Sequence, residues 1–194
     1  MNITQSETHS WDRGADYDDL KEKLIKCYLA FGEERTRKKT YCWIALLQLY
    51  NACRISESCL AFKQFVEQGW SGGKVSVKIS KSESLKVFKD GEKKLTKPRF
   101  RDIVNIPLDW GVKPDIVFFN ETTPLPDSIK SNVLTWMLST FKINTHSLRY
   151  ATINKLVSMG KPLNVISKFI GHRNLNMLLT YTQQKEVQKA QAGL

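Results

Sequence analysis

Helical patterns flank a central stretch of period-two alternation, and this order constrains the fold more than any other feature of the sequence. Four short segments in the centre read as strands: 75–79, 85–88, 92–96 and 103–106. Asp90 and Gly91 lie between the second and third of them, and this dipeptide is typical of tight β-hairpin turns. Pro107 ends the fourth. We therefore expect a small antiparallel sheet inserted into a helical protein.

Apolar side chains at helical spacing predict helices on both sides of this sheet. The expected helices span 16–31, 36–53 and 56–62 before it, and 127–138, 146–159, 163–170, 175–180 and 183–192 after it. Ser56 is placed to cap the third helix, and Gly171 to end the one over 163–170. The sequence thus predicts the α+β class, a mainly helical domain with a small antiparallel sheet on one side.

The charge is large and unevenly distributed. The chain has 30 basic and 19 acidic residues, a net charge of +11. Residues 1–22 carry a net −4, so the rest carries +15, and we expect residues 1–15 to form a mobile acidic tail. The central loops are the most basic: Lys86, Lys89, Lys93, Lys94, Lys97, Arg99 and Arg101. Such a domain favours a polyanionic partner such as nucleic acid, the alternative being a solvated basic face.

Other features exclude whole classes of protein. No apolar run approaches the roughly 20 residues that cross a bilayer, and the start of the chain is too polar and acidic for a signal peptide. We therefore expect a cytoplasmic protein without a membrane partner. The four cysteines, at 27, 42, 53 and 59, match no zinc spacing, and buried reduced thiols are expected. The sequence predicts no metal site.

The informative residues lie in the last quarter of the chain. His146 and Arg149 are three apart, so on a helix their side chains leave the same face. Gly171-His172 follows, and then Tyr181. Arginine binds phosphate oxygens, histidine moves protons near neutral pH, and tyrosine is a nucleophile once deprotonated. Singly, each has an ordinary structural explanation. Together they suit the attack of a tyrosine on a phosphodiester.

This series resembles the catalytic domain of tyrosine recombinases, the phage-type integrases. The matching boxes are Asn51-Ala-Cys-Arg-Ile-Ser-Glu57, Thr145-His-Ser-Leu-Arg-Tyr150, Phe169-Ile-Gly-His-Arg-Asn174 and Thr180-Tyr-Thr182. The resemblance runs from about Asp16 to the end of the chain. Tyr150 departs from the pattern, since many relatives carry a second histidine there, and we do not count it as catalytic.

The resemblance implies a role for each residue. Arg54 and Arg149 would hold the scissile phosphate, and Tyr181 would attack it to form a 3′-phosphotyrosine. A lysine would protonate the leaving 5′ oxygen; Lys97 fits this role best and Lys81 is the rival. Two histidines complete the set: His146 assists proton transfer at the tyrosine, and His172 hydrogen-bonds the phosphate. Neither a cofactor nor a metal is needed, because the covalent link keeps the energy of the bond.

The implied function is site-specific DNA recombination by an integrase of a virus or mobile element, in the host cytoplasm or nucleoid. The partner would be double-stranded DNA, with a dimer on each site and a tetramer in synapsis, and there would be no small-molecule substrate. Two alternatives stay open: a catalytically retired DNA-binding or regulatory protein of this fold, and a tyrosine-type topoisomerase.

The same resemblance divides the chain into parts. Residues 16–182 would be the catalytic domain, and residues 183–194 a C-terminal tail that either frays or is exchanged between protomers. The residues before Arg54 are too few for the separate N-terminal DNA-binding domain of full-length recombinases. We therefore expect a catalytic domain alone.

Overall fold

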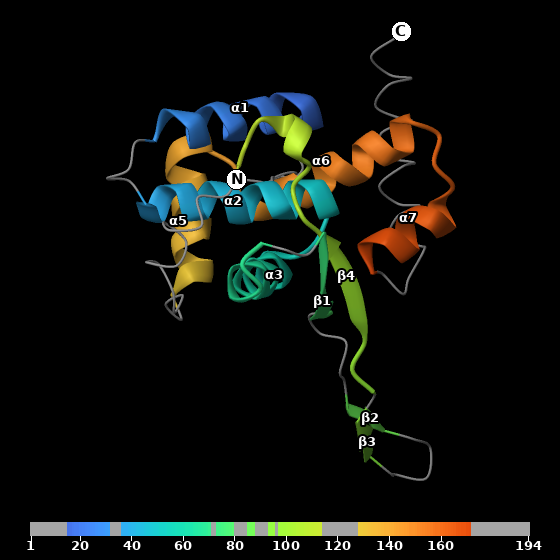
Figure 1. Ribbon diagram of the computed structural model, residues 1–194. Helices are drawn as coiled ribbons and strands as arrows, with labels where there is room; N and C mark the ends of the chain where they lie inside the picture. The colour runs from blue at the N-terminus through green and yellow to red at the C-terminus, as the bar shows by residue number, and fades with distance from the viewer. Residues whose placement is uncertain are drawn as a thin grey trace, which may run out of the picture.

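Helix α2 is the centre of the fold, and α1, α3, α5, α6 and β4 are arranged around it (Figure 1). The structure is a computed structural model that describes residues 15–31, 36–70, 73–79, 85–87, 93–95, 97–113 and 128–171, with the backbone alone at 36, 85–87 and 93–95. Its helices are α1 (Tyr17–Ala30), α2 (Thr36–Asn51), α3 (Ile55–Glu67), α5 (Ile129–Phe141), α6 (Thr145–Ser158) and α7 (Leu163–Ile170), with a short 3-10 turn, η2 (Leu108–Trp110). The tails predicted at 1–15 and 183–194 lie outside the described residues, apart from Ala15.

The core follows from the composition of α2. Eight consecutive residues, 42–49, are fully or almost fully buried, and only Gln48 among them is polar. A helix that is apolar all round must be covered on every side. Accordingly α2 contacts α1, α3, α5, α6 and β4. Helix α1 instead has one apolar face, with Leu20, Leu24 and Tyr28 buried against α2, and its first turn is capped by Asp16, whose carboxylate accepts from the Asp19 N–H at 2.9 Å.

The strands form two antiparallel ribbons. Strand β1 (Lys74–Lys78) pairs with β4 (Phe100–Val104), and Val75 lies opposite Ile103. Strands β2 (Leu85–Val87) and β3 (Lys93–Leu95) pair with each other as the predicted hairpin. Figure 1 shows β1 and β4 running away from the helices, with β2 and β3 at the far end. The α+β class predicted from the sequence is confirmed.

Several predicted boundaries were wrong, and packing explains them. Helix α3 begins at Ile55 with Arg54 as its N-cap residue, not at Ser56, and it runs on to Glu67 because Phe65 and Val66 extend its buried face. Strand β4 begins three residues before the predicted strand. Helix α5 continues to Phe141, whose ring lies edge-on to Trp136 with centroids 5.3 Å apart. Helices expected at 175–180 and 183–192 lie outside the described residues.

Candidate functional site

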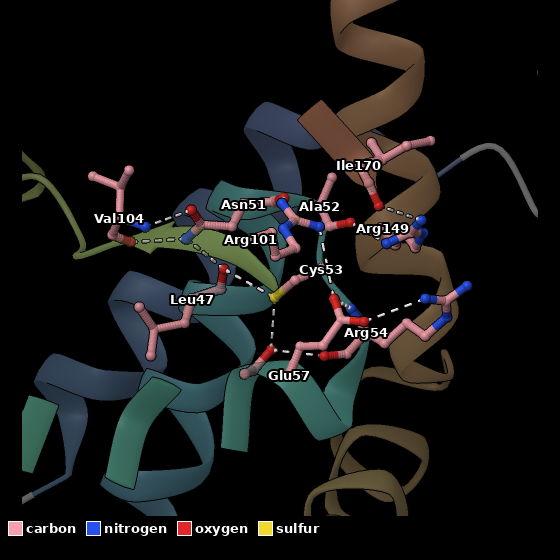
Figure 2. Close-up of polar contacts among 11 residues, drawn as sticks. Leu47, Asn51, Ala52, Cys53, Arg54, Glu57, Arg101, Val104, Arg149 and Ile170 are labelled. Atoms are coloured by element: carbon pink, nitrogen blue, oxygen red, sulfur yellow. Dashed lines mark hydrogen bonds and ion pairs between the residues drawn. The ribbon is translucent and has the colours of Figure 1, made fainter. Parts of the chain in front are cut away.

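The turn between α2 and α3 gathers the charged groups of the candidate site (Figure 2). Ala52 adopts a left-handed backbone conformation with φ of 47°, which ends α2 abruptly. The carbonyl groups at the end of a helix lack partners within the helix and carry its negative partial charge. Here guanidinium groups satisfy two consecutive carbonyls, since Arg101 donates to Asn51 at 2.6 Å and Arg149 donates to Ala52.

Asn51 joins this turn to the sheet. Its side-chain amide donates to the Val104 carbonyl and accepts from the Val104 N–H, both at 2.8 Å, much as a neighbouring strand would. The same amide also donates to the Leu47 carbonyl at 3.0 Å. These hydrogen bonds therefore hold the end of α2 against the end of β4. The sequence analysis placed Asn51 in the first box but gave it no role.

Arg54 and Glu57 close the first turn of α3. The Glu57 side chain is fully buried, whereas 26% of the Arg54 side chain is exposed. One carboxylate oxygen, Oε2, accepts from the Arg54 backbone N–H at 3.1 Å, and Oε1 accepts from Arg54 Nη1 at 3.2 Å. Arg54 is thus tied to Glu57 through its backbone and its side chain, and part of that side chain stays open to solvent.

Arg149 reaches the same turn from α6. The residue is 3% exposed, and besides Ala52 it donates through Nη2 to the Ile170 carbonyl at 3.0 Å, at the end of α7. One guanidinium therefore bridges the carboxyl ends of two helices, where a positive charge is favoured. Figure 2 shows Arg54, Arg101 and Arg149 gathered around the Ala52–Arg54 turn.

Polar contacts between α2 and α6 set the position of Arg149. Near the start of α6, the Thr145 carbonyl accepts from the Gln48 side chain at 2.9 Å. Two turns further on, the Thr152 hydroxyl donates to the Leu49 carbonyl. All these groups are buried, so their hydrogen bonds are costly to break. The two contacts lie on either side of Arg149 along α6, so they fix the position of Arg149 relative to α2.

Arg101 is the residue that the sequence analysis missed as part of the site. It was counted with the basic loops, but its side chain is 7% exposed and its Nη1 lies 3.7 Å from Glu57 Oε2. The signal was available in the alternation of β4, since Arg101 shares a face with the buried Ile103. An arginine on the inner face of a strand needs buried partners.

The electrostatics of the site favour an anion. Among the described residues, the Glu57 carboxylate interacts electrostatically with the guanidinium groups of Arg54, Arg101 and Arg149, so these four side chains together carry a net charge of +2. Burial lowers the pKa of Arg149 to about 10; Arg54 adds to this shift, and Glu57 opposes it. Burial also lowers the pKa of Arg101. A bound anion would relieve this excess.

Of the remaining predicted site residues, the structure describes His146 and Lys97 only. His146 lies in the first turn of α6 and is exposed, whereas Arg149, three residues further along the helix, is buried. The His146 ring lies edge-on to Tyr150 with centroids 5.9 Å apart. Lys97 is exposed in the segment that leads into β4. His172, Tyr181 and the rival lysine Lys81 lie outside the described residues.

Gly171 precedes His172 and is tightly placed. It caps α7 in the left-handed conformation, with φ of 70°. A Cβ atom there would come within 3.2 Å of Ile79 Cδ1 and 3.8 Å of Arg101 Cδ. The predicted helix stop at Gly171 is therefore confirmed, and its lack of a side chain also allows α7 to approach the sheet.

Two other searches of the described residues gave negative results. Across the described ranges, no cluster of three or more histidine, cysteine or acidic side chains could hold a metal ion. Nor does any helix in this part of the chain have the length and apolar character needed to cross a membrane. The four cysteines are free, and Cys42 and Cys53 are buried.

Comparison with known proteins finds two viral proteins named as putative integrases. It is 38% identical over 195 residues to "Putative integrase V10" of Sputnik virophage, covering 90% of this chain and 86% of that protein. It is 30% identical over 183 residues to "Putative integrase ORF241" of Acidianus two-tailed virus, covering 91% of this chain and 66% of that protein.

A third relative carries no functional name. The chain is 28% identical over 195 residues to an uncharacterised protein of Methanocaldococcus jannaschii, covering 91% of this chain and 85% of that protein. No protein-family model and no solved structure matches the chain. The identity and coverage shared with the virophage protein, supported by the archaeal-virus protein, show that this chain belongs to an integrase family.

Proposed function

We propose that the protein is a site-specific DNA recombinase that cuts and rejoins DNA through a 3′-phosphotyrosine. The observation that carries the proposal is the group of three arginines, two of them with buried side chains, around the buried Glu57 carboxylate. Guanidinium groups fit the paired oxygens of a phosphate, and their excess charge suits the charge that builds up during phosphoryl transfer. The integrase names of the viral relatives agree with DNA as the substrate.

In the proposed reaction the arginines bind and Tyr181 attacks. Arg54, the most open of them, and Arg149 would bind the non-bridging oxygens of the scissile phosphate. The Tyr181 oxygen forms a bond to phosphorus as the bond to the 5′ oxygen breaks, and Lys97 gives that oxygen a proton. His146 takes part in proton transfer at Tyr181, and His172 hydrogen-bonds the phosphate. A 5′ hydroxyl from a second DNA end reverses the step and releases the tyrosine.

The assembly belongs to the same proposal. Residues 16–182 form the catalytic domain, which binds double-stranded DNA as a dimer on each site and as a tetramer in synapsis. The positive charge outside the first 22 residues supplies a salt-sensitive attraction to the phosphate backbone. Residues 183–194 are the segment to exchange between protomers.

Covalent trapping tests the proposal. The protein is mixed with nicked DNA duplexes randomised around the nick, so that no target sequence has to be assumed. A nick a few nucleotides 3′ of the scissile phosphate lets the short released strand diffuse away, which prevents rejoining. We expect a protein–DNA adduct that survives denaturing electrophoresis and disappears in Tyr181→Phe. Tyr41→Phe is the matched control, because Tyr41 packs on Trp136 within the fold and should keep the adduct.

The other outcomes are equally informative. DNA binding without an adduct would overturn the catalytic proposal and favour the retired DNA-binding protein. An adduct that persists in Tyr181→Phe would overturn the choice of nucleophile. Relaxation of a supercoiled plasmid without any joining of two sites would favour the topoisomerase. Sequencing of the trapped strands would reveal the target.

A further inference from the structure

Arg101 is the one member of the arginine group for which the proposed reaction has no role. It lies in β4, and its Nη2 donates to the Asn51 carbonyl at 2.6 Å while its Nη1 lies 3.7 Å from Glu57 Oε2. Only 7% of its side chain is exposed, against 26% for Arg54. Arg101 is therefore less exposed than Arg54, and both of its terminal nitrogens face protein groups, the Asn51 carbonyl and the Glu57 carboxylate.

Glu57 is shared between the two arginines. Its Oε1 accepts from the Arg54 guanidinium, and its Oε2 faces Arg101 and accepts from the Arg54 backbone N–H. A carboxylate held from both sides has a single orientation, and the direction of the Arg54 side chain depends on it. Without Arg101, Glu57 would lose one of the two arginines that its carboxylate faces.

Arg101 also contacts the end of α7. Its guanidinium lies over the Phe169 ring, 5.8 Å from the centroid, and its Cδ is 3.8 Å from where a Cβ on Gly171 would stand. One side chain thus touches the ends of α2 and α7 and, through Glu57, the start of α3. The start of α3 carries Arg54, and the ends of α2 and α7 supply the carbonyl groups that accept from Arg149.

We propose that Arg101 is a positioning residue that holds Glu57 and the Asn51 carbonyl so that Arg54 points at the scissile phosphate. It acts through Glu57 and does not touch DNA. The proposal rests on the recombinase function for the identity of the phosphate. The orientation of Arg54 by Arg101 is a property of the free protein and can be tested separately.

The first test uses a spectroscopic signal that needs no activity. In ¹⁵N-labelled protein, the Arg54 guanidinium, assigned by its absence in Arg54→Lys, should show slow rotation because Glu57 holds it. We expect Arg101→Gln to speed this rotation or shift the signal, and Arg101→Lys to give an intermediate result, because lysine keeps the charge but cannot reach both partners. An unchanged Arg54 signal in a folded Arg101→Gln protein would overturn the proposal.

The second test is a double-mutant cycle on the rate of covalent trapping at saturating DNA. We expect Arg101→Gln to slow trapping at least about tenfold, since small misplacements of a catalytic group are costly. In the Arg54→Lys background the same change should cost less than about threefold, because its effect passes through Arg54. Equal losses in both backgrounds would overturn the proposal.

Controls separate this proposal from the function on which it rests. Lys74→Gln removes one positive charge from the neighbouring strand, where Lys74 pairs with Asp102 on the surface, and should trap DNA at the wild-type rate. If Arg101→Gln does not fold, Arg101→Lys carries both tests. If the wild-type protein never traps DNA, the recombinase proposal is contradicted. If the Arg54 signal nevertheless changes in Arg101→Gln as expected above, the positioning role is supported.

Discussion

The Arg54 and Glu57 side chains are hydrogen-bonded at the first turn of α3, yet their solvent exposures differ sharply. The carboxylate accepts from the Arg54 backbone at 3.1 Å and from its guanidinium at 3.2 Å. Glu57 is fully buried by this arrangement, while a quarter of the Arg54 side chain stays exposed. The buried Glu57 carboxylate therefore holds the partly exposed Arg54 side chain in place, and an arginine held in this way is suited to bind an anion.

Glu57→Gln should destabilise the protein strongly. The change keeps the size of the side chain but leaves three guanidinium groups without their buried counter-charge, a loss typically worth about 3 kcal/mol. Urea unfolding measures it. Glu67→Gln is the matched control on the same helix, because Glu67 is exposed and its pairing with Lys63 should be worth less than about 1 kcal/mol. Equal losses in the two variants would contradict the role given to Glu57.

Gly171→Ala should cost more stability than Gly160→Ala. Both glycines have nearly the same φ, 70° and 69°, so both changes carry a similar backbone strain of about 1 kcal/mol. Only at Gly171 would the new Cβ meet a neighbour, Ile79, at 3.2 Å. Thermal or urea unfolding of the two variants isolates this contact. Adding Ile79→Val should recover part of the difference, and no recovery would count against the contact.

Alkaline pH should destabilise the protein, in part through Cys59. Burial raises the pKa of this thiol from 9.0 to about 12. Between these values the folded protein keeps a proton that the unfolded chain loses, so the free energy of unfolding falls as pH rises above 9, by up to about 1.4 kcal/mol per pH unit. Cys59→Ala should make this fall less steep. Urea unfolding at pH 8 and pH 10 checks it, and an unchanged slope would contradict it.

DNA binding should weaken steeply as salt is raised from low to physiological concentration. Each phosphate contact by a lysine or arginine releases counterions, so the logarithm of affinity falls linearly with the logarithm of salt. Lys97→Gln should make this slope shallower by about one unit. Lys23→Gln on α1 should not, since Lys23 pairs with Asp19 and α1 lies away from the strands (Figure 1). A flat response of the wild type would contradict the basic hairpin of β2 and β3 as a DNA contact.

Local patterns predicted the order of elements well because they depend on near neighbours. The face of α1 with Leu20 and Leu24, the alternation of β1 and the stop at Gly171 are all set within a few residues. Boundaries failed where a particular side-chain contact decides the end of a helix. Arg54 became the N-cap residue of α3 because Glu57 turns back onto it, and α5 was extended by the packing of Phe141 on Trp136.

The candidate site was predictable only in part. Arg54 and Arg149, named from their boxes, lie at one turn, whereas the roles of His172 and Tyr181 remain predictions outside the described residues. Arg101 was read as a surface charge. Its position two residues before the buried Ile103 indicated an inward-facing side chain, but no local pattern identifies the carboxylate and the carbonyl, some 50 residues earlier, that meet it.

By itself, the sequence determined the helices, the hairpin, the excess of positive charge and the identity of the boxes, because these depend on residue type and short-range periodicity. Only the tertiary structure decided which charges are buried together. A guanidinium can leave water only where carbonyls and carboxylates from other elements replace its hydration. The ends of α2 and α7, together with Glu57, supply those groups to Arg101 and Arg149. No local pattern in β4 or α6 predicts that these carbonyl and carboxylate groups will lie there.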